Sequence, residues 1–128
     1  MAAYSFYLTT KLIFSDDAAA DLARELVGLP PGRAFVVTDR GIVQAGIAGP
    51  LIDVLGQAGR APGIFANIPS NPGVEYVTAA MAAAREADPA IVVAIGGGSA
   101  IDIGKAVGLL LAHESDQWES FQWGRTPV

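Results

Sequence analysis

Residues 91–105 read IVVAIGGGSAIDIGK, an apolar run that leads directly into three glycines and a serine. Such a run is typical of a strand buried on both faces of a parallel sheet. The glycines let the backbone turn sharply and let a ligand approach the main chain. The helix predicted from about residue 100 to residue 112 would direct free amides and its positive dipole end at that ligand. Because ligands of open α/β sheets bind beyond the carboxyl ends of the strands, this segment predicts a phosphate site.

Two widespread phosphate-binding fingerprints do not fit this glycine run. The dinucleotide pattern GxGxxG would begin at Gly96, but Ile101 occupies its third glycine position. The Walker A pattern ends in Gly-Lys followed by Ser or Thr, whereas Ala106 follows Lys105 here. The predicted phosphate site therefore depends on the succession of strand, glycines and helix, and an ATPase of the Walker type is not favoured.

The rest of the chain alternates apolar runs with helical patterns. The predicted strands are 4–14, 34–38, 63–66 and 90–95, and the predicted helices are 18–27, 42–58, 74–87 and about 100–112. Asn71-Pro72 suits the N-cap and first position of the third helix, and Pro50 must kink the second helix or start a new one. This order predicts an α/β fold, a parallel sheet with helices on both faces, with an N-terminal β-strand or hairpin.

Asp39 directly follows the predicted strand 34–38, at the carboxyl end where ligands of such sheets bind. A carboxylate there can accept hydrogen bonds from both ribose hydroxyls of an adenosine, and it would repel a 2′-phosphate, which favours NAD over NADP. Structural roles stay open at both sites. Asp39 could be an ordinary turn or cap residue, and Ser99 with Asp102 could form a capping box behind a simple glycine turn.

Length and composition limit the function classes. The chain has 128 residues, 52% of them hydrophobic, which suits one globular domain. A formal net charge of −5 without clusters of Lys or Arg disfavours nucleic acid and anionic membranes as partners. The absence of cysteine excludes disulfides and thiolate metal sites. Neither a signal peptide nor a membrane-spanning stretch is recognisable, and a cytoplasmic location is expected.

Several segments, taken in order along the chain, resemble the iron-containing (group III) alcohol dehydrogenases. Residues 96–112, GGGSAIDIGKAVGLLLA, resemble the family segment GGGSxxDxxKA. Residues 35–39 resemble the family's first nucleotide-binding strand with its terminal Asp. Residues 69–72 resemble its PNP loop, and residues 10–14 resemble its opening strand. Because the match runs through nearly the whole chain, it is more specific than any single motif.

The resemblance implies a Rossmann-like domain that binds NAD. By this resemblance, Asp39 would bind the adenosine ribose, and Gly97, Gly98 and Ser99 would bind the pyrophosphate. Asp102 would lie near the nicotinamide-side ribose, and Asn71 would line the cofactor cleft. The resemblance also implies reversible hydride transfer between NAD(H) and a small alcohol or aldehyde. Iron or zinc, held by an Asp and three His of a helical C-terminal domain, would polarise the alcohol oxygen.

The sequence departs from the family pattern in three places. Phe14 is followed by Ser-Asp-Asp instead of a Gly-x-Gly-like turn, and Pro50 is unusual in its helix. The metal-binding domain has no counterpart before Val128, and the only histidine, His113, lies at a predicted helix end. Residues 1–128 are therefore expected to form a truncated N-terminal NAD-binding domain with no catalytic or metal-binding residues, inactive by itself.

Two alternatives to an alcohol dehydrogenase stay open. One is a related enzyme with a similar nucleotide domain, such as a glycerol dehydrogenase, a maleylacetate reductase or a dehydroquinate synthase-like protein. The other is a stand-alone nucleotide-binding domain without catalysis. Truncation before the next strand of the family fold would leave an uncovered sheet edge, which invites pairing with another chain. A homodimer or higher oligomer is therefore expected, with the predicted strand 4–14 as a candidate contact.

Overall fold

Three parallel strands form the centre of the computed structural model, which describes residues 3, 5 and 9–114. They are β1 (Ala34–Thr38), β2 (Gly63–Phe65) and β3 (Ile91–Ile95), arranged in the order β2-β1-β3. All five residues of β1 are buried, as the apolar run predicted for a central parallel strand. The register places Val36 of β1 opposite Ile64 and Val93, so the carboxyl ends of β1 and β3 lie at one edge.

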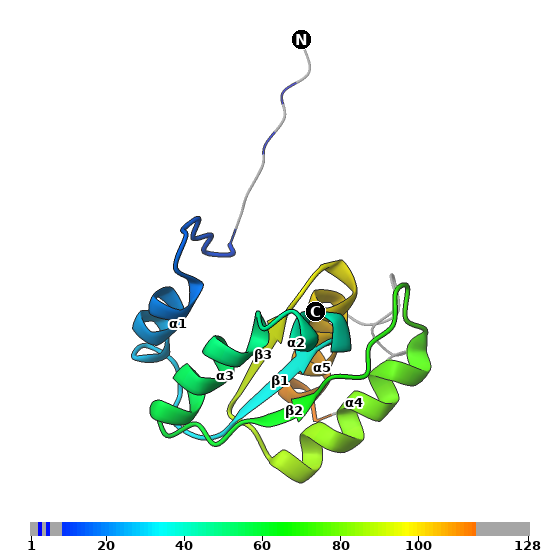
Figure 1. Ribbon diagram of the computed structural model, residues 1–128. Coiled ribbons are helices and arrows are strands. Elements are labelled where there is room, and N and C mark those ends of the chain that lie inside the picture. The colour runs from blue at the N-terminus through cyan, green and yellow to red at the C-terminus, as the bar shows by residue number, and fades with distance from the viewer. Residues whose placement is uncertain (1–2, 4, 6–8, 115–128) are drawn as a thin grey trace.

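Helices cover both faces of this sheet (Figure 1). On one face α1 (Ala18–Leu26) and α3 (Ala48–Gln57) pack against Ala34 and Val36. On the other face α4 (Val74–Ala87) and α5 (Gly98–Ala112) pack against Phe35 and Val37. The alternation of side chains along β1 thus supplies both cores. The predicted α/β architecture, with helices on both faces, is confirmed.

The predicted helix over 42–58 is divided in two. A short helix α2 (Arg40–Gln44) follows β1, and α3 begins at Ala48. Pro50 lies in the first turn of α3, where its missing N–H leaves no helical hydrogen bond unmade. Of the two outcomes expected for Pro50, the start of a new helix is the one observed.

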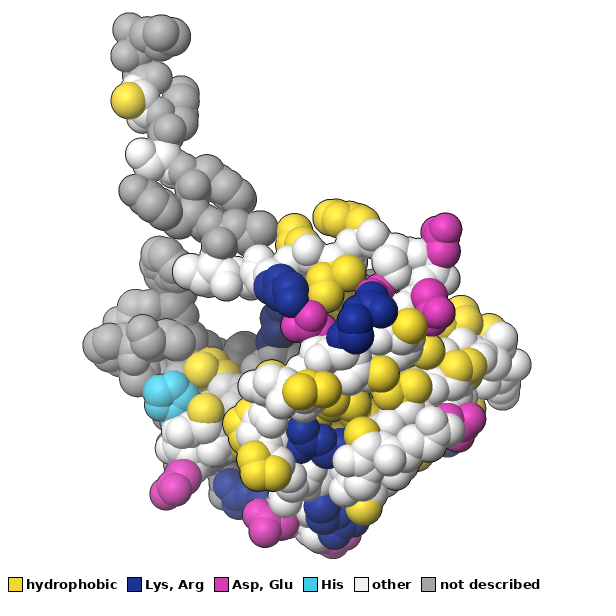
Figure 2. All heavy atoms as spheres, turned by 90° about the vertical axis from the view of Figure 1, so that its left-hand side faces the viewer, with side chains coloured by type: hydrophobic (Ala, Val, Ile, Leu, Met, Phe, Trp, Pro, Cys, Tyr) yellow, Lys and Arg dark blue, Asp and Glu magenta, His cyan; other side chains and the backbone are white. Residues whose placement is uncertain are grey.

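The N-terminal strand predicted over 4–14 does not form where the structure describes this segment. Residues 9–14 have no strand conformation, and residues 4 and 6–8 lie outside the described residues. Residues 9–14 are exposed, beyond α1 and away from the sheet, with Phe14 92% exposed. The strand prediction failed because aromatic and β-branched residues form a strand only beside a partner, and no described strand pairs with this segment. Figure 2 faces the α1 side, where hydrophobic side chains lie exposed among charged ones.

A buried arginine anchors α1 to the rest of the fold. Arg60 is 7% exposed, and its guanidinium donates hydrogen bonds to backbone carbonyls at the end of α1 and in the loop that follows. The Nη2 atom lies 2.9 Å from the carbonyl oxygen of Leu26 and 3.4 Å from the carbonyl oxygen of Leu29. The Nη1 atom lies 3.1 Å from the carbonyl oxygen of Gly32 and also donates to the carbonyl of Pro30. The positive charge thus meets the negative end of the α1 dipole.

Candidate functional site

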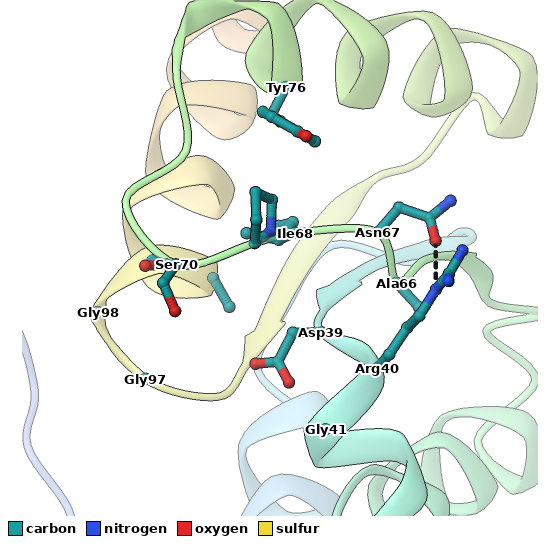
Figure 3. Close-up of a pocket in the computed structure, with 13 residues that line it drawn as sticks. Asp39, Arg40, Gly41, Ala66, Asn67, Ile68, Ser70, Tyr76, Gly97 and Gly98 are labelled. Atoms are coloured by element: carbon teal, nitrogen blue, oxygen red, sulfur yellow. Dashed lines mark hydrogen bonds between the residues drawn. The ribbon is translucent and has the colours of Figure 1, made fainter.

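A cleft of about 700 Å³ opens beyond the carboxyl ends of β1 and β3. Residues 39–41 at the start of α2, residues 66–70 after β2, and residues 97–100 at the start of α5 surround it, and Tyr76 of α4 lies above (Figure 3). This volume is within the range of about 300–1,000 Å³ that is usual for small-molecule sites. The cleft lies where an open α/β sheet is expected to bind its ligand.

Asp39 has the structural role of a helix cap, one of the two roles that its sequence position left open. Its Oδ1 accepts a hydrogen bond of 2.8 Å from the backbone N–H of Ile42, so Asp39 is the N-cap of α2. No described residue donates to its Oδ2, and Figure 3 shows the carboxylate directed toward the glycine turn. One carboxylate oxygen is therefore fixed by the protein, and the other is available to a ligand in the cleft.

The three glycines of the turn differ in what the protein requires of them. Gly96 has a φ of +147°, and an added Cβ would lie 3.1 Å from Ala100 Cβ and 3.2 Å from Asp39 Oδ2, so glycine is required there. Gly97 has an ordinary φ of −83°. At Gly97 and at Gly98 an added Cβ would meet nothing within 4 Å. Glycine at these two positions serves no packing need and leaves room in the wall of the cleft.

The first turn of α5 presents unpaired amides to this open wall. The N-cap residue Gly97 has no side chain to cap the helix, and the first amide bonded to its backbone is that of Ile101, at 3.1 Å from the Gly97 oxygen. The amides of residues 98–100 therefore have no backbone acceptor among the described residues. The alternative in which Ser99 and Asp102 form a capping box is not observed, because the N-cap is Gly97 and Ser99 lies inside the first turn of the helix.

Two of the predicted site residues lie outside the main cleft. Asn71 and Asp102 line a second cleft of about 400 Å³ between the starts of α4 and α5, and Ser99 lines both clefts. Asn71 is not the N-cap of α4, because the helix begins at Val74 with Gly73 as its cap. Asn71 instead adopts a φ of +49°, a left-handed conformation that asparagine tolerates better than most residues. Asp39, Gly97, Gly98 and Ser99 are thus gathered in the main cleft, with Asn71 and Asp102 beside it.

Several residues that line the main cleft were not predicted from the sequence. Arg40 and Asn67 are joined there by a hydrogen bond of 3.0 Å from Nε to Oδ1 (Figure 3). Asn67 also pairs with Asp39 through an isolated backbone bridge. The position of Arg40 directly after Asp39 was a signal in the sequence, whereas the contribution of Asn67 depends on the path of the loop after β2.

The described residues contain no group of three or more His, Cys, Asp or Glu that could hold a metal ion. The Asp and three His that the family resemblance implies therefore find no counterpart in this part of the structure, and His113 stands at the C-cap of α5. No helix within the described ranges is long and apolar enough to cross a membrane.

Comparison with known proteins gives one consistent family. The family model described as iron-containing alcohol dehydrogenase matches residues 9–128. The chain is 38% identical to 4-hydroxybutyrate dehydrogenase of Cupriavidus necator over 117 residues. This match covers 89% of the chain and 29% of the Cupriavidus enzyme. Sulfoacetaldehyde reductase of Bifidobacterium kashiwanohense in complex with NAD⁺ matches with a TM-score of 0.79 and 26% identity, over 98% of this chain and 33% of that one.

An iron-containing alcohol dehydrogenase of Thermotoga maritima has the same fold, with a TM-score of 0.83 and 23% identity over 98% of this chain and 35% of that one. The chain spans about 29% of the length of the Cupriavidus enzyme. The family model, in contrast, covers the chain from residue 9 to its last residue, including every element that builds the cleft. The chain therefore belongs to the iron-containing alcohol dehydrogenase family.

Proposed function

We propose that residues 1–128 form the NAD-binding domain of an NAD-dependent alcohol dehydrogenase. The observation that carries this proposal is the wall of the main cleft at Gly97 and Gly98. Neither residue needs to be glycine for the protein's own packing, and both stand at the uncapped start of a 15-residue helix. Unpaired amides, a helix dipole and space for close approach are together what a pyrophosphate requires.

Each predicted site residue has a place in this proposal. The pyrophosphate binds at Gly97, Gly98 and Ser99, and the free Oδ2 of Asp39 accepts hydrogen bonds from the adenosine ribose. The second cleft receives the nicotinamide half, with Asp102 near its ribose and Asn71 in the wall. Ser99 lines both clefts and so marks the passage from one half of the cofactor to the other.

The proposed activity is reversible hydride transfer between an alcohol and its aldehyde. The nicotinamide ring, when bound, supplies the hydride acceptor. The residues of this chain bind and orient the cofactor, and the described residues contain no group that fits a metal ion, so no step through a metal is assigned to them. The expected homo-oligomer, the cytoplasmic location and the small alcohol or aldehyde substrate stay predictions.

Titration of the chain with NAD⁺ by calorimetry tests this proposal. Saturable binding is expected, weakened about tenfold or more in Asp39→Ala by the loss of a charge-assisted hydrogen bond. Asp39→Asn keeps a good N-cap for α2, so its loss of affinity cannot be ascribed to helix fraying. Asp53→Ala, which removes an exposed carboxylate of α3 outside the cleft, is the matched control. A folded wild-type chain that does not bind NAD⁺ would overturn the proposal.

A further inference from the structure

Arg40 lies on the wall of the main cleft, directly after Asp39. Its Nε donates a hydrogen bond of 3.0 Å to Oδ1 of Asn67. Figure 3 shows these two side chains meeting on the side of Asp39 that faces away from Gly97 and Gly98. The hydrogen bond restrains a long, exposed side chain, so the guanidinium is held at the cleft before a ligand arrives.

Arg40 forms no ion pair with the described residues. Asn67 is a neutral partner. Asp39 is its neighbour in sequence, but the two side chains form no ion pair, and Oδ1 of Asp39 accepts its hydrogen bond from the amide of Ile42. The Nη1 and Nη2 atoms of Arg40 donate no hydrogen bond to the described residues. A planar guanidinium with free terminal donors is well matched to a phosphate group.

The order of groups along the cleft follows the order of groups in a dinucleotide. The amides at the start of α5 lie on one side, Asp39 lies in the middle, and Arg40 with Asn67 lies on the other side (Figure 3). With the pyrophosphate at the amides and the adenosine ribose at Asp39, the 2′ position and the adenine extend toward Arg40. This step rests on the proposed function.

We propose that Arg40 is a second cofactor-specificity residue, which allows the cleft to bind NADP(H) as well as NAD(H). Asp39 repels a 2′-phosphate, whereas the guanidinium beside it offers that group a positive charge and free N–H donors. The two side chains therefore act against each other, and discrimination against NADP is weaker than Asp39 alone would produce. Asn67 is the positioning residue that holds the guanidinium at the cleft.

The test compares the Kd for NADP⁺ with the Kd for NAD⁺ in calorimetric titrations of the full chain. Arg40→Ala is expected to raise the ratio of the NADP⁺ Kd to the NAD⁺ Kd about tenfold. The change comes mainly from weaker NADP⁺ binding, because one charge-assisted hydrogen bond is lost. Added salt should reduce this effect, since the contact is at an exposed site. Arg33→Ala, which removes an exposed arginine at the opposite end of β1, is the matched control and should leave the ratio unchanged.

Two further variants separate charge from position. In an Asp39→Asn background the ratio should fall, and removal of Arg40 should then abolish most of the NADP⁺ binding. Asn67→Ala keeps the charge of Arg40 but releases its guanidinium, so the ratio should rise by a smaller factor than in Arg40→Ala. Because Arg40 and Asn67 are both exposed, neither change removes a core contact.

Each contrary outcome has a distinct meaning. An equal loss of affinity for both nucleotides in Arg40→Ala would overturn the inference in favour of a guanidinium that stacks on the adenine ring. An unchanged ratio with intact NAD⁺ binding would overturn the inference alone. Failure of the folded wild-type chain to bind either nucleotide would overturn the proposed function and this inference together.

Discussion

The Oδ2 atom of Asp39 lies 3.2 Å from the point at which Gly96 would carry a Cβ atom. The sheet register produces this proximity, because the preceding residues, Thr38 and Ile95, are paired between β1 and β3. The pairing is reinforced by the buried Thr38 hydroxyl, which donates a hydrogen bond of 2.7 Å to the Ile95 carbonyl across 57 residues of sequence. A carboxylate and a glycine turn from distant parts of the chain thus form one site.

Gly96→Ala is expected to destabilise the fold. The left-handed φ of +147° is strained for alanine, and the new methyl group would press on Ala100 and on the Asp39 carboxylate. The free energy of unfolding should fall by about 1–3 kcal/mol. Urea denaturation monitored by circular dichroism measures this change, and Gly97→Ala is the control, since its φ is ordinary and its surroundings are open. Equal stability of the two variants would contradict the role assigned to Gly96.

Gly98→Ala is expected to separate folding from cofactor binding. Gly98 is the first residue of α5, and alanine is better than glycine in a helix, so stability should stay the same or rise by up to about 1 kcal/mol. The added methyl group would occupy the space proposed for the pyrophosphate, so NAD⁺ should no longer raise the melting temperature. If NAD⁺ raised the melting temperature of this variant as much as that of the wild type, the ligand would not approach this turn.

The sequence predicted best those elements whose burial is continuous. The bounds of β1 and α4 agree with their predicted ranges, because a fully apolar run and a long alanine-rich helix leave few alternatives. The starts of helices were predicted less well. α5 begins at Gly98, although glycine is a poor helix former, and α4 begins two residues after Pro72. Local propensity does not decide these starts, because the surrounding fold can override it.

Four predicted site residues meet in the main cleft because β1 and β3 are adjacent, which the α/β pattern already favoured. The placement of Asn71 depends on its own left-handed conformation in the loop before α4, which the residue type indicates only weakly. The N-terminal segment illustrates the opposite error. Its residues favour a strand, yet a strand requires a neighbour, and residues 9–14 have none among the described strands.

Replacement of Arg60 is expected to loosen α1. The buried guanidinium bonds four backbone carbonyls between Leu26 and Gly32, and Arg60→Met would leave them without these donors. We expect the free energy of unfolding to fall by about 2–3 kcal/mol. Arg60→Lys should recover only part of this loss, because an ammonium group lacks the planar fork of donors. Chemical denaturation gives these values.

Arg33→Met is the matched control for Arg60, because Arg33 is exposed and its Nε makes one hydrogen bond of 3.3 Å, to the Ala61 carbonyl. Its effect should stay within about 0.5 kcal/mol. Hydrogen exchange should also show faster opening of α1 in Arg60→Met than in the control. Equal exchange rates for α1 in the two variants would mean that Arg60 does not anchor this helix.

The 128-residue chain is expected to bind NAD⁺ without oxidising an alcohol. Hydride transfer requires that the alcohol lose its proton, and in the described residues no cluster of ligands could hold a metal ion to lower the pKa of its hydroxyl. Incubation of the chain with NAD⁺, a primary alcohol and Fe²⁺ or Zn²⁺ should therefore produce no absorbance of NADH. Calorimetric NAD⁺ binding by the same sample is the control for an intact cleft. Sustained NADH formation that depends on both alcohol and protein would contradict this prediction and would locate an alcohol-activating group within these residues.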